Sequence, residues 1–351
     1  MDSTKTVITK ETKNQISVDF EGKLTFKERL KKKLSTSNTW IKAIINIFRF
    51  ILMLGVSYVI IYPFVTKIAG SFMSKEDVVD ATVAIIPKHF TFDIYKYMVT
   101  ENNYLEALLN TALLSLFCAI IQTLIACLIG YGLAKFKFKG NKVLMAAVVL
   151  TMVIPHRTMR MSLIQHFTDF DFLKVNAWGY RGIIDIILGG AQLDLANTFW
   201  PLIILSIFGL AFKNGLYIYL MRQFFKGVPD ELEESAYIDG SGIIRTFMTI
   251  IIPLSVPMMI TVFLFAFSWQ WTDSFYVSLF YLDKTAYQSF TNVYAIPQPF
   301  VEAIGKAGGS SFRAAIQNTA SLMIIAPLVV VYLFCQKYIV QGIERSGLTA
   351  D

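Results

Sequence analysis

Residues 107–134 read ALLNTALLSLFCAIIQTLIACLIGYGLA and contain no charged side chain. A helix that crosses the hydrocarbon core of a bilayer needs about 20 consecutive apolar residues, and this stretch is longer than that. A soluble core does not need so long an uninterrupted apolar run. The stretch therefore predicts a transmembrane helix that crosses with some tilt.

Similar runs on both sides extend the prediction to an all-α polytopic membrane protein with six transmembrane helices. The predicted spans are about 43–66, 107–134, 142–165, 195–221, 246–272 and 314–336. The third is the weakest, because its apolar part ends at Pro155 and is followed at once by charged residues. It is counted as a span because six spans place both chain ends on one side. The predicted organisation is a basic tail, 1–40, followed by a single transmembrane domain, 41–351.

The composition agrees with this fold class. Of 351 residues, 55% are hydrophobic and only 16% charged, with a mean hydropathy of +0.53, whereas soluble proteins carry about 25% charged residues. The net charge of +7 is expected from cytoplasmic Lys and Arg. Nucleic-acid binding is disfavoured, because no basic stretch is interleaved with stacking aromatics. The cysteines lie in apolar runs without metal-ligand spacing, so we expect no metal and no cofactor.

Basic residues set the orientation. The tail ends in Lys31, Lys32 and Lys33, and the short link between the second and third spans holds Lys135, Lys137, Lys139 and Lys142. Both segments fall on one side in the six-span arrangement, and the positive-inside rule makes that side cytoplasmic. We therefore expect a multi-pass protein of the cell (plasma) membrane, with both termini in the cytoplasm.

The loop between the fourth and fifth spans has ordered patterning. Residues 229–254 read PDELEESAYIDGSGIIRTFMTIIIPL. Proline and acidic residues suit the first turn of a helix, and Asp239-Gly240 is a turn signal in which glycine is free to take a positive φ. A second helix then presents one apolar side formed by Ile244, Phe247, Met248 and Ile251. This acidic hairpin indicates a docking element for another protein, with a plain surface linker as the alternative.

The same segment resembles the EAA loop of ABC importer permeases, which has the pattern E-A-A, three residues, G, nine residues, I, one residue, L-P. Glu234, Ser235 and Ala236 match E-A-A with one small-for-small change, and Gly240 and Ile250 follow at the family spacing. Ile252 stands in place of the leucine, and Pro253 follows it.

Other stretches resemble the sugar-importer branch, in particular the second maltose-type permease. They are Asn110-Thr111, the small and aromatic exit from the second span at 130–140, Leu220–Phe225, and Trp269–Asp273. The resemblance covers about Ile61 to Gly347. It departs in a long outer loop, Phe167–Asp194, and in the N-terminal tail.

The resemblance implies a non-enzymatic half-pore. Its expected partners are a second homologous permease subunit, a cytoplasmic ABC ATPase dimer, an extracellular solute-binding protein and the lipid bilayer. The chain has no G-x-x-x-x-G-K-[ST] stretch, so ATP hydrolysis is expected from the partner. Small residues such as Gly130 and Gly132 permit close helix packing with the second permease. The predicted ATPase-coupling residues are Glu233, Glu234, Ser235, Ala236, Asp239, Gly240, Ile250 and Pro253.

A substrate pathway is predicted from polar and aromatic residues near two spans. Lys213 lies within the fourth span, where charge is costly and often lines a pathway. The stretch Trp269, Gln270, Trp271 and Asp273 offers flat rings and hydrogen-bonding groups to a sugar. The alternatives are packing of Lys213 against a partner helix and anchoring of the tryptophans at the membrane interface.

The leading functional hypothesis is the permease of an importer for a mono- or oligosaccharide, working by alternating access. A permease for another solute, such as phosphate or a polyamine, is the first alternative. A stand-alone secondary carrier would not need the EAA-like loop. An intramembrane enzyme is disfavoured because neither H-E-x-x-H nor G-x-S-x-G occurs.

Overall fold

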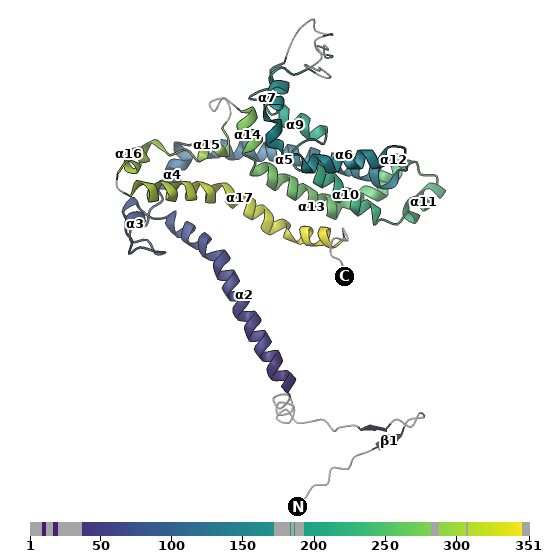
Figure 1. The fold of residues 1–351 in the computed structure, drawn as a ribbon, viewed down its shortest axis with the longest axis horizontal. Coiled ribbons are helices and arrows are strands. Elements are labelled where there is room, and N and C mark those ends of the chain that lie inside the picture. The colour runs from purple at the N-terminus through teal and green to yellow at the C-terminus, as the bar shows by residue number, and fades with distance from the viewer. Residues whose placement is uncertain are drawn as a thin grey trace, which may run out of the picture. The chain divides into compact units, whose positions relative to one another are not determined.

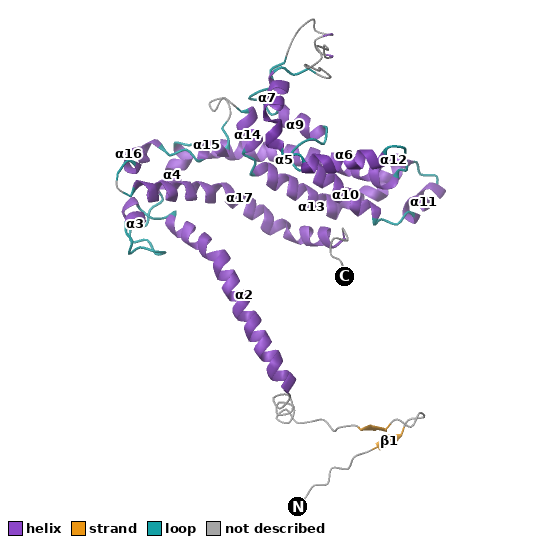
Figure 2. Cartoon of the chain, in the orientation of Figure 1, coloured by secondary structure: helices purple, strands orange, loops and turns teal. Residues whose placement is uncertain are grey.

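The computed structural model describes residues 9–11, 17–19, 37–171, 193–281, 288–306 and 308–345, together with Ile183 and Ile186. Most of these residues are helical, with loops between the helices and one short strand pair, as Figure 2 shows. The chain divides into two compact units, Met1–Thr66 and Lys67–Asp351. In the first unit, β1 (Thr9–Glu11) and β2 (Ser17–Asp19) pair antiparallel. Most of the predicted tail 1–40 and most of the outer loop 167–194 lie outside the described residues, and the domain boundary at residue 40 stays a prediction.

The helices follow one another along the chain in the order drawn in Figure 1. They are α2 (Ser37–Gly70), α3 (Lys75–Val79), α4 (Asp93–Thr100), α5 (Tyr104–Lys135), α6 (Asn141–Val153), η1 (His156–Met159), α7 (Arg160–Thr168), α9 (Trp200–Ile207), α10 (Asn214–Lys226), α11 (Glu231–Ile238), α12 (Ile243–Thr246), the π-helix η3 (Phe247–Ile251), α13 (Ile252–Trp271), α14 (Phe275–Phe280), α15 (Phe290–Val293), η4 (Gln298–Phe300), α16 (Val301–Ile304) and α17 (Gly309–Arg345).

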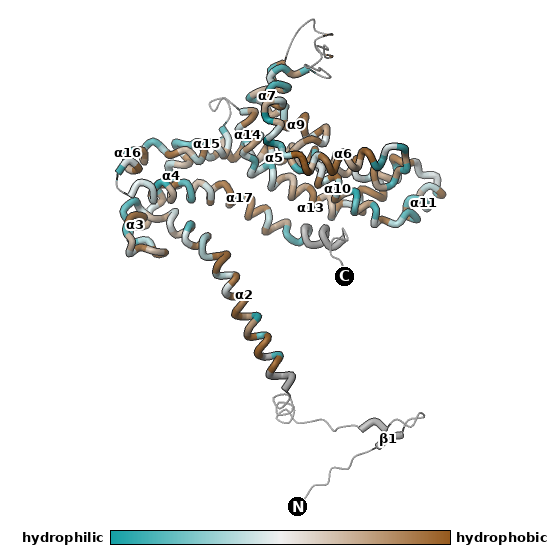
Figure 3. Tube along the Cα trace, in the orientation of Figure 1, coloured by the Kyte–Doolittle hydropathy of each residue, from teal (hydrophilic) through white to brown (hydrophobic). Residues whose placement is uncertain are grey.

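Four stretches of helix in the described chain are long and apolar enough to cross a membrane. They are Ile44–Gly70, Tyr104–Lys135, Ile243–Trp271 and Gly309–Tyr338, and the brown runs of Figure 3 follow them. The apolar side chains of α2 from Ile44 to Ile68 are all exposed. Such a helix satisfies its backbone internally and suits contact with lipid or with a partner helix. The all-helical polytopic fold is thereby confirmed.

The third predicted span is bent. α6 and the helical segment His156–Thr168 meet at 90° across a short break, and they make a fifth crossing if the bent pair is one span. The break has a local cause, since the residue before a proline is driven out of the helical region. Ile154, which precedes Pro155, has φ −67° and ψ 121°.

The fourth predicted span is interrupted, so the expectation of a continuous helix over 195–221 is wrong. α9 ends at Ile207, and the chain passes through two left-handed residues, Gly209 (φ 69°) and Lys213 (φ 66°), before α10 begins. A helix of 13 residues is about 20 Å long, less than the ~30 Å hydrocarbon core. The count of six spans stays a prediction.

The core of the second unit is built around α5. This helix packs against α10 and α13, and α13 packs against α17. The approach of α5 and α10 is very close, because a Cβ added at Gly130 would stand 2.7 Å from Cβ of Met221. Gly130 therefore allows two helices of this chain to pack closely. The sequence instead predicted that Gly130 packs against a second permease. A Cβ at Gly132 would meet nothing within 4 Å.

Within this unit, the predicted coupling loop and the short helices of the chain around α3 and α16 lie at opposite ends of the helix bundle. Figure 1 places α11 at one end, and α3, α4 and α16 at the other. The separation agrees with loops that face opposite sides of a membrane.

Candidate functional site

The predicted coupling loop folds as a helix, a tight turn and a second helix. α11 ends at Ile238 and is capped by Asp239, and the following Gly240 adopts φ 81°, which confirms the positive φ expected there. The turn is closed by two backbone hydrogen bonds, from the N–H of Gly240 to the carbonyl of Tyr237 and from the N–H of Ser241 to the carbonyl of Ala236. This is the hydrogen-bonded helix end that glycine favours.

Glu233 anchors α11 to the end of α5. Its Oε2 accepts a hydrogen bond of 2.9 Å from Oη of Tyr131, and its Oε1 lies 3.5 Å from Nζ of Lys135. Lys135 also donates to the carbonyl of Val228 at 2.6 Å and to Oδ1 of Asp230 at 2.5 Å. Its ammonium holds the pKa of Asp230 below the ordinary value. Both Glu233 and Lys135 have almost fully buried side chains, so their contact is shielded from water.

The neighbouring residues of the motif divide between two faces of α11. Ala236 is buried beside Glu233, whereas Glu234, Ser235 and Asp239 are exposed. The hydroxyl of Ser235 only turns back to the carbonyl of Leu232. The exposed face therefore offers two carboxylates that are free to meet another molecule.

Apolar side chains continue this exposed face across the turn. Ile238 is 86% exposed, Ile244 80% and Met248 58%. The four-residue apolar side predicted for the second helix is wrong in part, since Phe247 and Ile251 are buried in the core. Exposed apolar side chains suit contact with a partner protein, and Ile244 and Met248 also belong to the stretch Ile243–Trp271 that is long and apolar enough to cross a membrane.

Ile250 and Pro253 lie where the hairpin enters the bundle. Ile250 belongs to the π-helix η3, and Pro253 is the second residue of α13. Proline has no N–H and its ring crowds the carbonyl four residues earlier, so the preceding turn widens into a π-helix. The motif proline therefore shapes the joint between the hairpin and its span.

Sequence reasoning missed Tyr131 and Lys135 as members of this site. The ring centroid of Tyr131 lies 4.7 Å from that of Phe247 and 5.5 Å from that of Phe225. This aromatic packing holds the hairpin against the helix bundle. From the sequence, Lys135 indicates only the orientation of the chain. The sequence does carry a signal for this contact: a lysine ends the second span, and an acidic loop is predicted on the same side of the membrane.

The predicted substrate residues do not all meet. Lys213 and Asp273 line one cavity of about 530 Å³ between the α6–η1 turn, residues 209–216 and the start of α14. Nζ of Lys213 lies 5.1 Å from the ring centre of Trp269, and Trp269 is 45% exposed. Oδ1 of Asp273 accepts the N–H groups of Phe275 and Tyr276. Burial raises the pKa of Asp273 to about 6, against these two donors, which lower it.

Trp271 and Gln270 belong to the core. Trp271 is buried, donates from Nε1 to the carbonyl of Ile324 at 2.9 Å, and packs against Phe267 and Phe290. Gln270 is also buried. The flat face of Trp271 is therefore occupied, and only Trp269 keeps a surface that a ring of solute can stack on.

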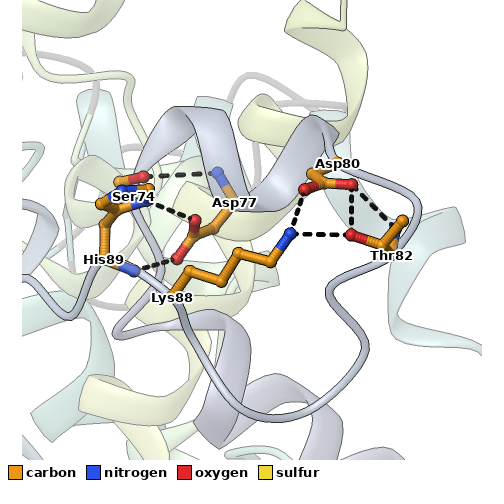
Figure 4. Close-up of polar contacts among 6 residues, drawn as sticks. All are labelled: Ser74, Asp77, Asp80, Thr82, Lys88 and His89. Carbon is orange, nitrogen blue, oxygen red and sulfur yellow. Dashed lines mark hydrogen bonds and ion pairs between the residues drawn. The ribbon is translucent and has the colours of Figure 1, made fainter.

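A polar network orders the loop after α2, at the end of the bundle far from the hairpin (Figure 4). Asp77 is buried and accepts the N–H of His89 at 2.6 Å and its Nδ1 at 2.8 Å. Lys88 reaches Asp80 at 2.7 Å and Thr82 at 2.8 Å. These contacts hold residues 74–89 in a defined loop conformation, in a segment that the sequence predicts to be an outer loop.

The geometry defines a class of protein: a polytopic helical membrane protein with a helical hairpin at one end and a polar cavity beside its broken spans. Residues 122–345 match the family described as binding-protein-dependent transport system inner membrane component. The match covers more than half of the chain, and the chain belongs to this family.

Individual relatives agree. The chain is 28% identical to the galactooligosaccharides transport system permease protein GanQ of Bacillus subtilis (strain 168), over 86% of this chain and 94% of the relative. It is 27% identical to the maltodextrin transport system permease protein MalD of Streptococcus pneumoniae, over 91% and 97%. A solved bacterial ABC transporter involved in import of the acidic polysaccharide alginate has the same fold, with a TM-score of 0.62 at 20% identity, over 86% of this chain and 98% of that one. The resemblance to binding-protein-dependent ABC permeases is confirmed.

Proposed function

We propose that this chain is one half of the membrane pore of an ATP-driven importer for a mono- or oligosaccharide. The single observation that carries the proposal is the anchored hairpin. Glu233 fixes α11 to the end of α5, while Glu234 and an apolar surface face away from the bundle. A loop built only as a linker has no need of a buried ion pair on one face and free carboxylates on the other.

In this proposal the hairpin seats on a cytoplasmic ABC ATPase dimer. Movement of the ATPases displaces α11, and the Glu233–Lys135 contact passes the displacement to α5. A second homologous permease completes the pore, and an extracellular solute-binding protein delivers the solute. The spans then rock between inward- and outward-facing states around a central site, with both termini in the cytoplasm.

The saccharide is supported by the transport systems of the relatives and by the cavity beside Trp269. An aromatic ring next to hydrogen-bonding groups suits a sugar, which has an apolar ring face and polar hydroxyls. Permeases for phosphate or a polyamine, and a carrier without an ATPase, are the alternatives that an uptake experiment distinguishes.

The test combines uptake with recovery of the ATPase from membranes. Glu234→Lys reverses the charge of an exposed carboxylate and is expected to abolish uptake and to weaken ATPase co-purification, because lost charge pairs at an interface cost several kcal/mol. Ser235→Ala, which alters only a local hydrogen bond, is the matched control and should transport normally. Normal uptake by Glu234→Lys would refute the coupling role of the hairpin.

A further inference from the structure

The cavity beside the broken fourth span has an unusual charge balance. Its lining includes two cationic side chains, Arg157 and Lys213, and a single carboxylate, Asp273. Neither cation forms an ion pair within the described part of the chain. Nζ of Lys213 rests 5.0 Å and 5.1 Å from the rings of Phe212 and Trp269, which leaves its ammonium free to bind an anion.

Hydrogen-bonding groups of the same cavity are also unpartnered. Asn214 is 1% exposed, and neither its Oδ1 nor its Nδ2 has a hydrogen-bond partner among the described residues. Oδ2 of Asp273 is also buried without a hydrogen-bond partner among the described residues. Leaving a buried polar group unsatisfied costs about 1–3 kcal/mol, so these groups indicate a site that is built for a polar ligand. The volume of about 530 Å³ falls within the range of about 300–1,000 Å³ for small-molecule sites.

We propose that this cavity binds a uronic-acid unit, and that the imported saccharide is therefore acidic. Lys213 and Arg157 take the carboxylate, and Asn214 and Asp273 take ring hydroxyls. The inference rests on the proposed function, since it narrows the class of the saccharide. It assigns to this subunit a direct contact with the solute.

Two other ligands fit the same groups less well. A neutral sugar would leave the half-buried Lys213 without a counter-charge, where isolated charge is costly, and would give the exposed Arg157 no anionic partner. Inorganic phosphate supplies charge but few hydrogen-bond donors, so it would meet repulsion from Asp273 and leave its Oδ2 unpartnered. A uronate supplies both a carboxylate and hydroxyl donors.

The experiment is a competition uptake assay with the assembled transporter. The pool contains uronate-bearing oligosaccharides and the same molecules with each carboxylate reduced to a primary alcohol, and imported species are measured by mass spectrometry. The ratio of acidic to neutral uptake does not depend on how much transporter folds. We expect a ratio of about 10 or more for the native chain, and a loss of about 10-fold in that ratio for Lys213→Met.

Three further variants sharpen the assay. Lys213→Arg keeps the charge and should retain most of the preference, while Asn214→Asp adds a repelling carboxylate and should lower the ratio. Met and Arg carry the same Cβ as Lys, so the backbone at φ 66° is equally strained in each case. Lys306, which is exposed and belongs to the end of the bundle near α16, gives the control for general charge: Lys306→Met should leave the ratio unchanged.

The outcomes separate the two proposals. Preferred uptake of the neutral members, with a ratio that Lys213→Met does not change, would overturn the acidic site and leave the saccharide importer intact. ATP-dependent uptake of no saccharide in the pool would overturn the proposed function, and this inference with it.

Discussion

Replacing Lys135 by methionine removes the ammonium that joins α11 to α5 and keeps most of the apolar stem. Two acceptors lose their hydrogen-bond donor, the carbonyl of Val228 and Oδ1 of Asp230. Oε1 of Glu233 loses its ion-pair partner at 3.5 Å. The three contacts contribute different free energies to the seating of the hairpin, because the groups that Lys135 meets differ in exposure. The perturbation therefore tests which contact fixes the hairpin.

The shortest contact is not the most important. Asp230 is 2.5 Å from Lys135, but its side chain is 79% exposed, and exposed ion pairs contribute about 0–1 kcal/mol. Glu233 is farther, at 3.5 Å, but its side chain is only 10% exposed. Removing one partner of a buried pair costs about 3–5 kcal/mol. We therefore expect Lys135→Met to weaken seating of the hairpin by about 3 kcal/mol, or about 100-fold in the equilibrium.

The assay measures solute-stimulated ATP hydrolysis and uptake in the reconstituted complex. Lys135→Met should hydrolyse ATP with little uptake, because α11 would move without α5. The control is Lys139→Met, an exposed lysine of the same link, which should behave as the native chain. Adding Glu233→Gln to Lys135→Met removes the stranded carboxylate and should recover a large part of the coupling, since deleting both partners is far less costly than deleting one.

Equal behaviour of Lys135→Met and Lys139→Met would refute this reasoning. So would a double variant that is no better coupled than Lys135→Met alone. In either case the hairpin would be held by the packing of Tyr131 and not by the buried charge pair.

Three further predictions follow from local geometry. Gly130→Ala should destabilise the protein by about 1–3 kcal/mol in thermal unfolding, which is the usual cost of overpacking. The added Cβ would stand 2.7 Å from Cβ of Met221 in α10. Gly132→Ala is the control and should be near neutral, because a Cβ there meets nothing within 4 Å. Gly240→Ala should loosen the hairpin by about 1–2 kcal/mol, the cost of a left-handed backbone for a residue with a Cβ, and reduce uptake, whereas Gly242→Ala at φ −78° should transport normally. Burial raises the pKa of Asp77, but hydrogen bonds from His89 outweigh it and hold that pKa below its ordinary value of about 4. The outer loop should therefore resist proteolysis at neutral pH and lose that resistance as pH falls through the lowered pKa; Asp77→Asn should be sensitive at every pH, and a pH-independent native loop would contradict this.

Helix phase explains which site residues the sequence could place. The motif presents Glu233 and Glu234 as one acidic pair, but adjacent residues of an α-helix point about 100° apart. One carboxylate is therefore buried against Tyr131, and the other is exposed. Trp269 and Trp271 differ by about 200° for the same reason, and only Trp269 remains outside the core. The sequence identified the stretches, and the packing of α5 and α17 decided which member faces inward.

Of the two breaks in the predicted spans, the sequence can predict one and not the other. The bend after α6 follows from a rule that sequence carries, since Pro155 forces Ile154 out of the helix. The interruption before α10 does not, because nothing in Lys213 itself predicts φ 66°. Non-glycine residues in that conformation are uncommon and occur where surrounding structure imposes them. The close contact at Gly215, where a Cβ would lie 2.5 Å from Oγ1 of Thr151, places the start of α10 against α6.

That interruption is what makes the cavity possible. In a continuous helix over 195–221, the backbone groups of 209–213 would be bonded along the helix, and Lys213 would project from a smooth surface. The break turns the chain so that Lys213 caps α10 and lies beside the α6–η1 turn, where Arg157 also lines the space. Irregular backbone at membrane depth is tolerated where it lines a cavity or is buried in protein. The departure from the predicted span and the proposed binding site are therefore one feature: the same left-handed residue lies in the break before α10 and carries the charge that we propose selects the solute.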